Sequence, residues 1–186
     1  MNTLMRRALT PLAVLLLAAC GAENSGADSA GPPEPSSRTL AATLTAEDAL
    51  GTSGAVMNNA GLADVLAGVG PYTVFAPGNA AFTAAGADFA DAAMKAQAAA
   101  LMRAHIVPGV LTRGDIEAAL TKAADGKVQM RTMADGLLTF TREGTAVVVT
   151  AEDGAQARLT GDEMLAQNGV VQPVDGLLVK ATAPAD

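Results

Sequence analysis

The chain has 186 residues, a length that predicts one domain with additional segments. It carries 12 basic and 19 acidic residues, a formal net charge of −7 at pH 7. This acidic balance excludes nucleic-acid binding, which needs a basic surface, and electrostatic adsorption to anionic lipid. We therefore expect no nucleic-acid partner.

Residues 1–19 have the pattern of a secretory signal peptide. Arg6 and Arg7 precede the apolar run Leu12–Ala19, which is shorter than the roughly 20 residues of a transmembrane helix. Paired arginines also occur in twin-arginine export signals, but the residues that follow do not support that alternative. Removal of the segment leaves 10 basic and 19 acidic residues, a net charge of −9.

Cys20 is the only cysteine, and it follows the small residues at the end of this apolar run. The sequence Leu-Ala-Ala-Cys at 17–20 resembles the bacterial lipobox, in which the thiol is acylated and the cysteine becomes the new N-terminus. We predict lipidation at Cys20, with ordinary signal cleavage and a free thiol as the alternative. An acylated Cys20 leaves the mature domain no cysteine for disulfides, nucleophilic catalysis or metal binding. Gly21 in place of aspartate favours the outer membrane where that sorting rule applies.

The lipidated cysteine and a tether are predicted over residues 20–42. Within this range, Gly21–Ser37 is rich in glycine, alanine, serine and proline and lacks large apolar residues, so it cannot bury enough surface to fold. Its prolines favour a flexible-to-extended linker. We expect the globular domain at 43–182 and a C-terminal tail at 183–186.

Helical patterns come first in the domain, over Thr43–Gly70. Glu47–Leu50 predicts a short helix, and Ala55–Leu66 predicts a clearer one that glycines close. The sequence Asn-Asn-Ala-Gly at 58–61 is able to break this second helix in two.

The stretch YTVFAPGNAAF at Tyr72–Phe82 combines a strand, a stop and a helix start. Tyr72–Phe75 holds β-branched and aromatic residues that fit a half-buried strand. Pro77 cannot donate to a ladder and should end the strand. Asn79 is the expected N-cap of the helix that follows.

Asp88–Ile106 predicts an amphipathic helix that ends at Pro108, with Met102 on its polar side. Ile106–Leu111 predicts a short strand or extended link. Asp115–Ala124 predicts another helix, capped by Thr112 or by its own first residue.

From Gly126 onward the hydrophobic period changes from 3.6 to 2. Asp-Gly pairs at 135–136, 153–154 and 175–176 predict turns, the last of them joining a C-terminal hairpin. Helices followed by a strand meander, with one early strand, indicate an α+β fold. The strand candidates are Val128–Met133, Leu137–Arg142, Ala146–Thr150, Ala155–Thr160, Val170–Val174 and Leu177–Lys180.

Three strings resemble, in order and spacing, the signature segments of the fasciclin-like domain. They are YTVFAPGNAAF at Tyr72–Phe82, MRAHIVPGVL at Met102–Leu111 and NGVVQPVDGLL at Asn168–Leu178. The resemblance covers about Thr43–Thr182 and implies a single wedge-shaped domain in which helices flank a twisted β-sandwich. The motif positions to which it assigns structural roles are Tyr72, Phe75, Pro77, Asn79, Phe82, His105, Pro108, Asn168, Gly169 and Asp175.

The third string departs from the family pattern, which usually has a histidine after the aliphatic pair. Gln172 stands there and keeps a side chain capable of hydrogen bonding. Pro173 removes a backbone donor and predicts an edge strand or a bulge. Gly78 also stands where the family commonly has a hydroxyl residue.

His105 is the only histidine and the one candidate for acid–base chemistry. The chain has no Gly-x-Ser-x-Gly motif, and Ser53 is its only serine outside the leader and the tether, so no serine triad is indicated. A metal site would need a second histidine or a cysteine nearby. We predict a partly buried His105 that bonds to the backbone and joins helix to sheet.

Arg113–Asp115 spells Arg-Gly-Asp, the tripeptide that animal integrins read. Asp115 is better explained as a capping residue at a helix start. The acidic pairs Glu152–Asp153 and Asp162–Glu163 lack the alternation of an EF-hand loop. We interpret the first pair as part of a turn and the second as a helix start, and we predict no metal and no cofactor.

The resemblance implies a non-enzymatic module for adhesion or matrix binding, with a protein or polysaccharide as partner. Together with the leader and Cys20, it predicts a lipid-anchored protein of the outer membrane or periplasm rather than a freely extracellular one. One alternative is a periplasmic small-molecule binder or hydrolase, which requires His105 exposed in a pocket. Another is an accessory structural lipoprotein. The oligomeric state stays open.

Overall fold

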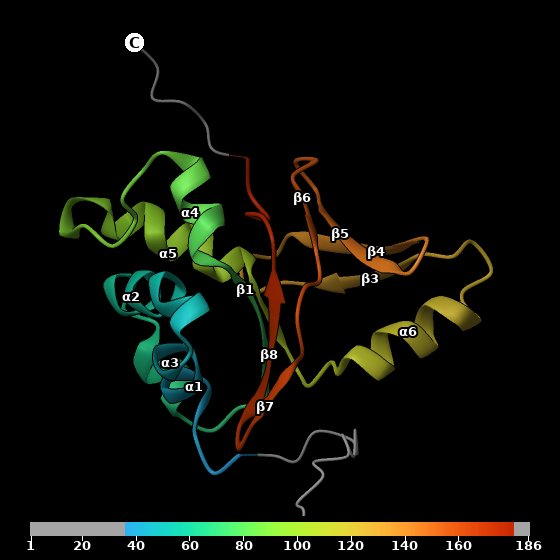
Figure 1. The fold of residues 1–186 in the computed structure, drawn as a ribbon, viewed down its shortest axis with the longest axis horizontal. Coiled ribbons are helices and arrows are strands. Elements are labelled where there is room, and N and C mark those ends of the chain that lie inside the picture. The colour runs from blue at the N-terminus through green and yellow to red at the C-terminus, as the bar shows by residue number, and fades with distance from the viewer. Residues whose placement is uncertain (1–35, 181–186) are drawn as a thin grey trace, which may run out of the picture. The chain divides into compact units, whose positions relative to one another are not determined.

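The computed structural model describes residues 36–180, which form a group of helices and two β-sheets (Figure 1). The predicted signal peptide at 1–19, Cys20 and the predicted tail at 183–186 lie outside these residues. The helices are α1 (Leu40–Ala46), η1 (Asp48–Leu50), α2 (Gly51–Asn59), α3 (Ala63–Ala67), α4 (Asn79–Ala85), η2 (Ala92–Met94), α5 (Lys95–Ala104) and α6 (Arg113–Lys122). The strands are β1 (Tyr72–Pro77), β2 (Ile106–Pro108), β3 (Val128–Arg131), β4 (Leu137–Glu143), β5 (Ala146–Ala151), β6 (Gln156–Arg158), β7 (Met164–Ala166) and β8 (Gly169–Val174).

The described strands form two four-stranded sheets. Sheet A has the order β2-β1-β8-β7, and sheet B is the antiparallel meander β3-β4-β5-β6. In sheet A, β1 runs parallel to β8, with Tyr72 opposite Gly169 and Pro77 opposite Val174. The first and last strands of the described chain are therefore neighbours.

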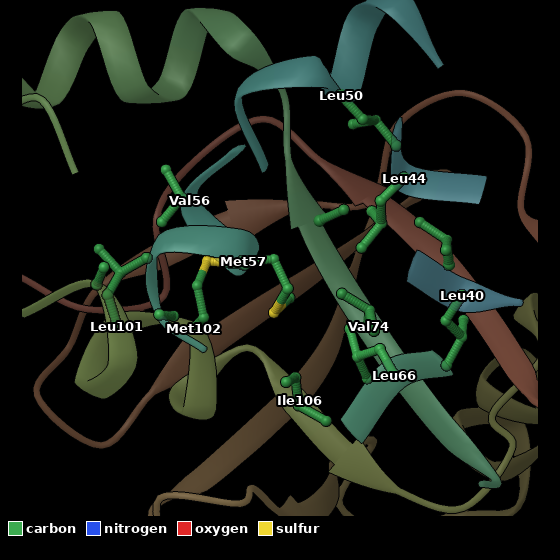
Figure 2. Packing of buried hydrophobic residues seen from close by; sticks show 14 of the residues in the cluster. Leu40, Leu44, Leu50, Val56, Met57, Leu66, Val74, Leu101, Met102 and Ile106 are labelled. Atoms are coloured by element: carbon green, nitrogen blue, oxygen red, sulfur yellow. The ribbon is translucent and has the colours of Figure 1, made fainter. Parts of the chain in front are cut away.

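Sheet A is buried on both faces. Val74 and Ala76 of β1 pack against helices α1, α2, α3 and α5, and Figure 2 shows Leu40, Leu44 and other leucines around Val74. Phe75 points to the opposite face, where its ring centroid lies 5.4 Å from that of Phe140 in sheet B. Helix α6 packs on this second side. A strand with two buried faces needs a near-continuous apolar run, which Thr-Val-Phe-Ala supplies.

Helix α1 begins at Leu40, inside the range 20–42 expected for the tether. The Thr39 hydroxyl accepts the N–H of Ala42 and caps it, and Leu40 and Leu44 are fully buried. Two large apolar residues in seven are too weak a periodic signal to predict such a helix. The break expected at 58–61 is confirmed, because α2 ends there and α3 follows.

The single helix predicted over Asp88–Ile106 is wrong in its extent. The 3-10 turn η2, capped by Asp91, precedes α5, which ends at Ala104. Met102, expected on the polar side, is fully buried. Each 3-10 residue advances about 120° rather than about 100°, so the turn rotates the buried face of the helix that follows.

The strands predicted from 128 to 160 are confirmed as β3 to β6, with small differences at their ends. Asp135 has a φ of 65°, a left-handed conformation that aspartate tolerates in turns. Strand β7 occupies the position where Asp162–Glu163 predicts a helix start, so that prediction is wrong. Leu177–Lys180 is not a strand, and its N–H groups bond to side chains instead: Leu178 to His105, and Lys180 to an aspartate.

Strand β8 is central in sheet A, so the edge position predicted from Pro173 is wrong. The proline is tolerated because β7 pairs with β8 only as far as Val171. Beyond that point the Pro173 carbonyl accepts the N–H of Thr160 from a less regular segment. In the part of the chain that the structure describes, no helix has the length and apolarity of a membrane span.

Candidate functional site

The junction between β1 and α4 is held by side chains that reach other helices. Asn79 is not the N-cap of α4, because the preceding glycine takes that position. Its Oδ1 instead accepts the N–H of Thr52 at 2.9 Å, and its Nδ2 donates to the Asp48 carbonyl at 2.8 Å. Thr52 lies in the first turn of α2, so Asn79 satisfies an unpaired donor of that helix and ties it to α4.

Asn168 connects the ends of two helices to sheet A. Its Oδ1 accepts the N–H of Leu40, the first residue of α1, at 2.8 Å. Its Nδ2 donates to the carbonyls of Leu66 and Gly68 at the end of α3, both at 2.8 Å. One buried amide therefore satisfies one donor and two acceptors that helix termini leave unpaired.

The apolar motif residues are distributed along β1 and the helix that follows it. Tyr72, half-buried, lies opposite Pro108 of β2 and Gly169 of β8. A Cβ on Gly169 would overlap the Tyr72 carbonyl oxygen, so only glycine allows this approach. Phe82 of α4 packs edge-on against Phe89, with ring centroids 6.4 Å apart. Phe82 thus joins the helical cluster, whereas Phe75 faces sheet B and α6.

His105 is fully buried, rather than partly buried as the sequence predicts. Nδ1–H donates to the Leu101 carbonyl at 2.8 Å, and Nε2 accepts the N–H of Leu178 at 2.9 Å. Burial lowers the pKa of the ring to about 4, so it is neutral at pH 7. The buried Ser53 hydroxyl donates to the Pro77 carbonyl at 2.8 Å. The hydrolase alternative requires an exposed His105, and this arrangement contradicts it.

Gln172 is the centre of a polar network on the α6 side of sheet A. The fully buried side chain donates from Nε2 to the Leu111 carbonyl at 3.0 Å and to Glu163 at 2.7 Å. Its Oε1 accepts from Nε of Arg113 at 3.1 Å. Glu163 also accepts the backbone N–H of Arg113 at 2.6 Å. The hydrogen-bonding role expected for Gln172 is thus present, and it joins α6 to β8.

The Arg-Gly-Asp tripeptide forms the first turn of α6 and is not an extended loop. The Thr112 hydroxyl donates to the Asp115 carboxylate at 2.6 Å and accepts the N–H of Asp115 at 3.1 Å. This capping box confirms the predicted cap, and its hydrogen bonds lower the pKa of Asp115. With Arg113 turned towards Gln172, both charged side chains are engaged within the domain.

The acidic turn residues bond to backbone groups. Asp175 accepts the N–H of Arg158 at 2.6 Å and so links the end of β8 to β6. Asp153 accepts the N–H groups of Ala155 and Lys180, as a turn residue should. Among residues 36–180, no group of three or more His, Cys, Asp or Glu side chains could hold a metal ion.

An open hollow of about 750 Å³ lies where β1 and β8 begin. Three loops line it: residues 67–71 before β1, Val110 and Thr112 before α6, and residues 165–169 around the β7–β8 turn. None of the lining side chains is charged. Val69 is 98% exposed and Val110 46% exposed. No pattern in the sequence predicts this surface, because a single valine beside glycine has no period to detect.

Comparisons with known proteins agree with this architecture. The family model described as the fasciclin domain matches residues 49–180. The fold is similar to a solved FAS1 domain pair from the insect cell adhesion molecule fasciclin I, with a TM-score of 0.64 and 14% identity. The similarity covers 77% of this chain and 51% of that one, so the chain spans about half the length of its structural relative. No curated protein matches the chain.

At 14% identity the structural likeness shows the fold alone, and it confirms the α+β fold implied by the three motif strings. The family model covers more than half of the sequence. The chain therefore belongs to the fasciclin domain family.

Proposed function

We propose that this protein is a lipid-tethered binding module that acts outside the cytoplasm, in adhesion or matrix contact. Its partner is a protein or polysaccharide of the cell envelope or matrix. Fasciclin domains are in general adhesion-type modules, and the structural relative is described as an insect cell adhesion molecule. The leader at 1–19 and the lipobox at Cys20 support export and anchoring.

The observation that carries this proposal is that the polar side chains of the motif strings form hydrogen bonds inside the domain. His105, Asn168 and Gln172 are buried, and their hydrogen bonds join helices to sheet A or, for His105, to the C-terminal segment at Leu178. They stabilise a scaffold and leave recognition to its surface loops, as in many binding domains. An acyl anchor would hold the domain at a membrane, and several copies on one envelope would add avidity.

The anchor is tested with Cys20→Ser, matched by Cys20→Ala, in cells fed an alkyne-labelled fatty acid. We expect the unaltered protein to carry the label and to sediment with membranes. Both variants should lose the label and appear in the soluble fraction. Equal labelling or equal membrane association in all three proteins would contradict the anchor.

The adhesion role is tested by capturing envelope and matrix fractions of the protein's own cells on the immobilised mature domain. The matched control is the same domain coupled to the support in urea through several lysines, which keeps the composition and prevents refolding. We expect a saturable partner that the control does not retain. If folded and unfolded domains retain the same material, the proposed binding role is wrong.

A further inference from the structure

We propose that the hollow at the start of β1 and β8 faces the bilayer and rests on its lipid headgroups. The inference builds on the lipid anchor of the proposed function and adds an orientation. The surface consists of the loop 67–71, Val110 and Thr112, and the turn 165–169, and we call it the membrane-facing surface.

Apolar exposure in the described residues gathers at this surface. Within residues 36–180, the exposed large apolar side chains are Val65 at 36%, Val69 at 98% and Val110 at 46%. Val69 and Val110 line the hollow, and Val65 lies in α3, the helix that leads into the loop of Val69. Single exposed valines need no explanation, but their collection at one end of a domain marks a contact surface.

The chain reaches its anchor from the same end of the domain. The N–H of Ser36 donates to the Leu165 carbonyl at 3.0 Å, and the N–H of Gln167 donates to the Arg38 carbonyl at 2.9 Å. Leu165 and Gln167 both line the hollow, and Figure 1 shows the described chain beginning beside β7. Cys20 lies 16 residues before Ser36, which limits their separation to about 55 Å in a fully extended chain.

The charge of this surface is compatible with contact with a bilayer. The protein is acidic, so most of its faces are repelled by a bilayer that contains anionic phospholipid. The membrane-facing surface has no charged lining residue, and the exposed cation Arg38 lies at its rim. An uncharged apolar surface with a cation at its rim carries no negative charge to oppose contact with such a bilayer.

Two valines bury too little area to hold a free domain on lipid, so the contact depends on the anchor. A tether of this length keeps the local concentration of lipid high and makes a weak contact effective. The parallel strands β1 and β8 then point away from the membrane. Their C-terminal ends and α4 are left free for a partner.

The orientation is tested with single cysteines in the lipidated protein. Cys20 is the only native cysteine, so once it is acylated a fluorophore attaches only to an introduced thiol. The labelled positions are Val69→Cys and Val110→Cys, with Ala84→Cys on α4 and Ala118→Cys on α6 as exposed controls. Each protein is reconstituted into vesicles of phosphatidylethanolamine and phosphatidylglycerol, and flotation is measured first.

We expect doxyl-labelled lipid to quench the fluorescence of the labels at 69 and 110. Aqueous iodide should quench these two labels several-fold less than the labels at 84 and 118. Replacing Val69 by aspartate in the Val110→Cys protein should restore the access of iodide to the label at 110. The side chain of Val69 is almost completely exposed, so we expect Val69→Asp to leave the fold intact. If the proteins float but iodide reaches all four labels equally, the proposed orientation is wrong and the anchor is not contradicted. If the shielding of the labels increases with protein density and doxyl-labelled lipid does not quench them, the surface contacts a second copy of the protein and the proposed membrane contact is wrong. Failure to float overturns the anchor and the orientation together.

Discussion

The buried motif strings and the loops beside them differ in how their side chains are used. Phe75, His105 and Asn168 lie inside the domain and bond to or pack against distant segments. Val69 and Val110, a few residues from the same strings, are exposed and line an open hollow. The residues by which the family is identified thus stabilise the fold, whereas the valines of the neighbouring loops are exposed.

The largest effect in this comparison should come from Phe75→Ala. The fully buried ring packs between the sheets against Phe140, so its loss leaves a cavity and should cost about 3–5 kcal/mol of unfolding free energy. Urea unfolding followed by circular dichroism measures it. A loss below about 1 kcal/mol would mean that the core between the sheets collapses around the gap.

His105 should make stability depend on pH. The unfolded ring takes up a proton below about pH 6.5, whereas the folded ring stays neutral down to about pH 4. Stability is therefore fully present above pH 6.5 and decreases as the pH falls towards 4, by roughly 3 kcal/mol. His105→Gln should be less stable at pH 7 and flatten this part of the profile. An unchanged profile in the variant would assign the dependence to carboxylates.

Asn168→Ala should cost somewhat less, about 2–3 kcal/mol, because it leaves one N–H and two carbonyls at helix ends without their partner. Asn168→Asp keeps the acceptor for Leu40 and loses both donors. Hydrogen exchange should show faster opening of α1 and α3 in the alanine variant than of sheet B. Uniform acceleration would show that the amide supports the whole domain.

The smallest effect should come from Val69→Ser and Val110→Ser. Both side chains are exposed, so each change should alter the unfolding free energy by less than about 0.5 kcal/mol. Thermal unfolding of the two variants beside Phe75→Ala measures the contrast. A loss comparable with that of Phe75→Ala would show that the loops belong to the core.

Local patterns were sufficient for elements whose signals lie close together in the chain. The strand at Tyr72–Phe75, the meander from 128 to 160 and the Thr112–Asp115 cap are each specified by neighbours within a few residues. Short elements have no such local signal where a distant partner supplies the stabilisation. Helix α1 is held by the amide of Asn168, and β7 by pairing with β8.

The sequence by itself determined the family and the α+β class, because side-chain type and spacing specify these directly. Only the tertiary structure decided what Asn79, Asn168 and Gln172 bond to, because those partners come from other elements. It also decided that Val69 and Val110 share one hollow next to Ser36. That proximity arises because β1 runs parallel to β8 and antiparallel to β2, which brings the loops before β1 and β8 and the loop after β2 to the same end of sheet A.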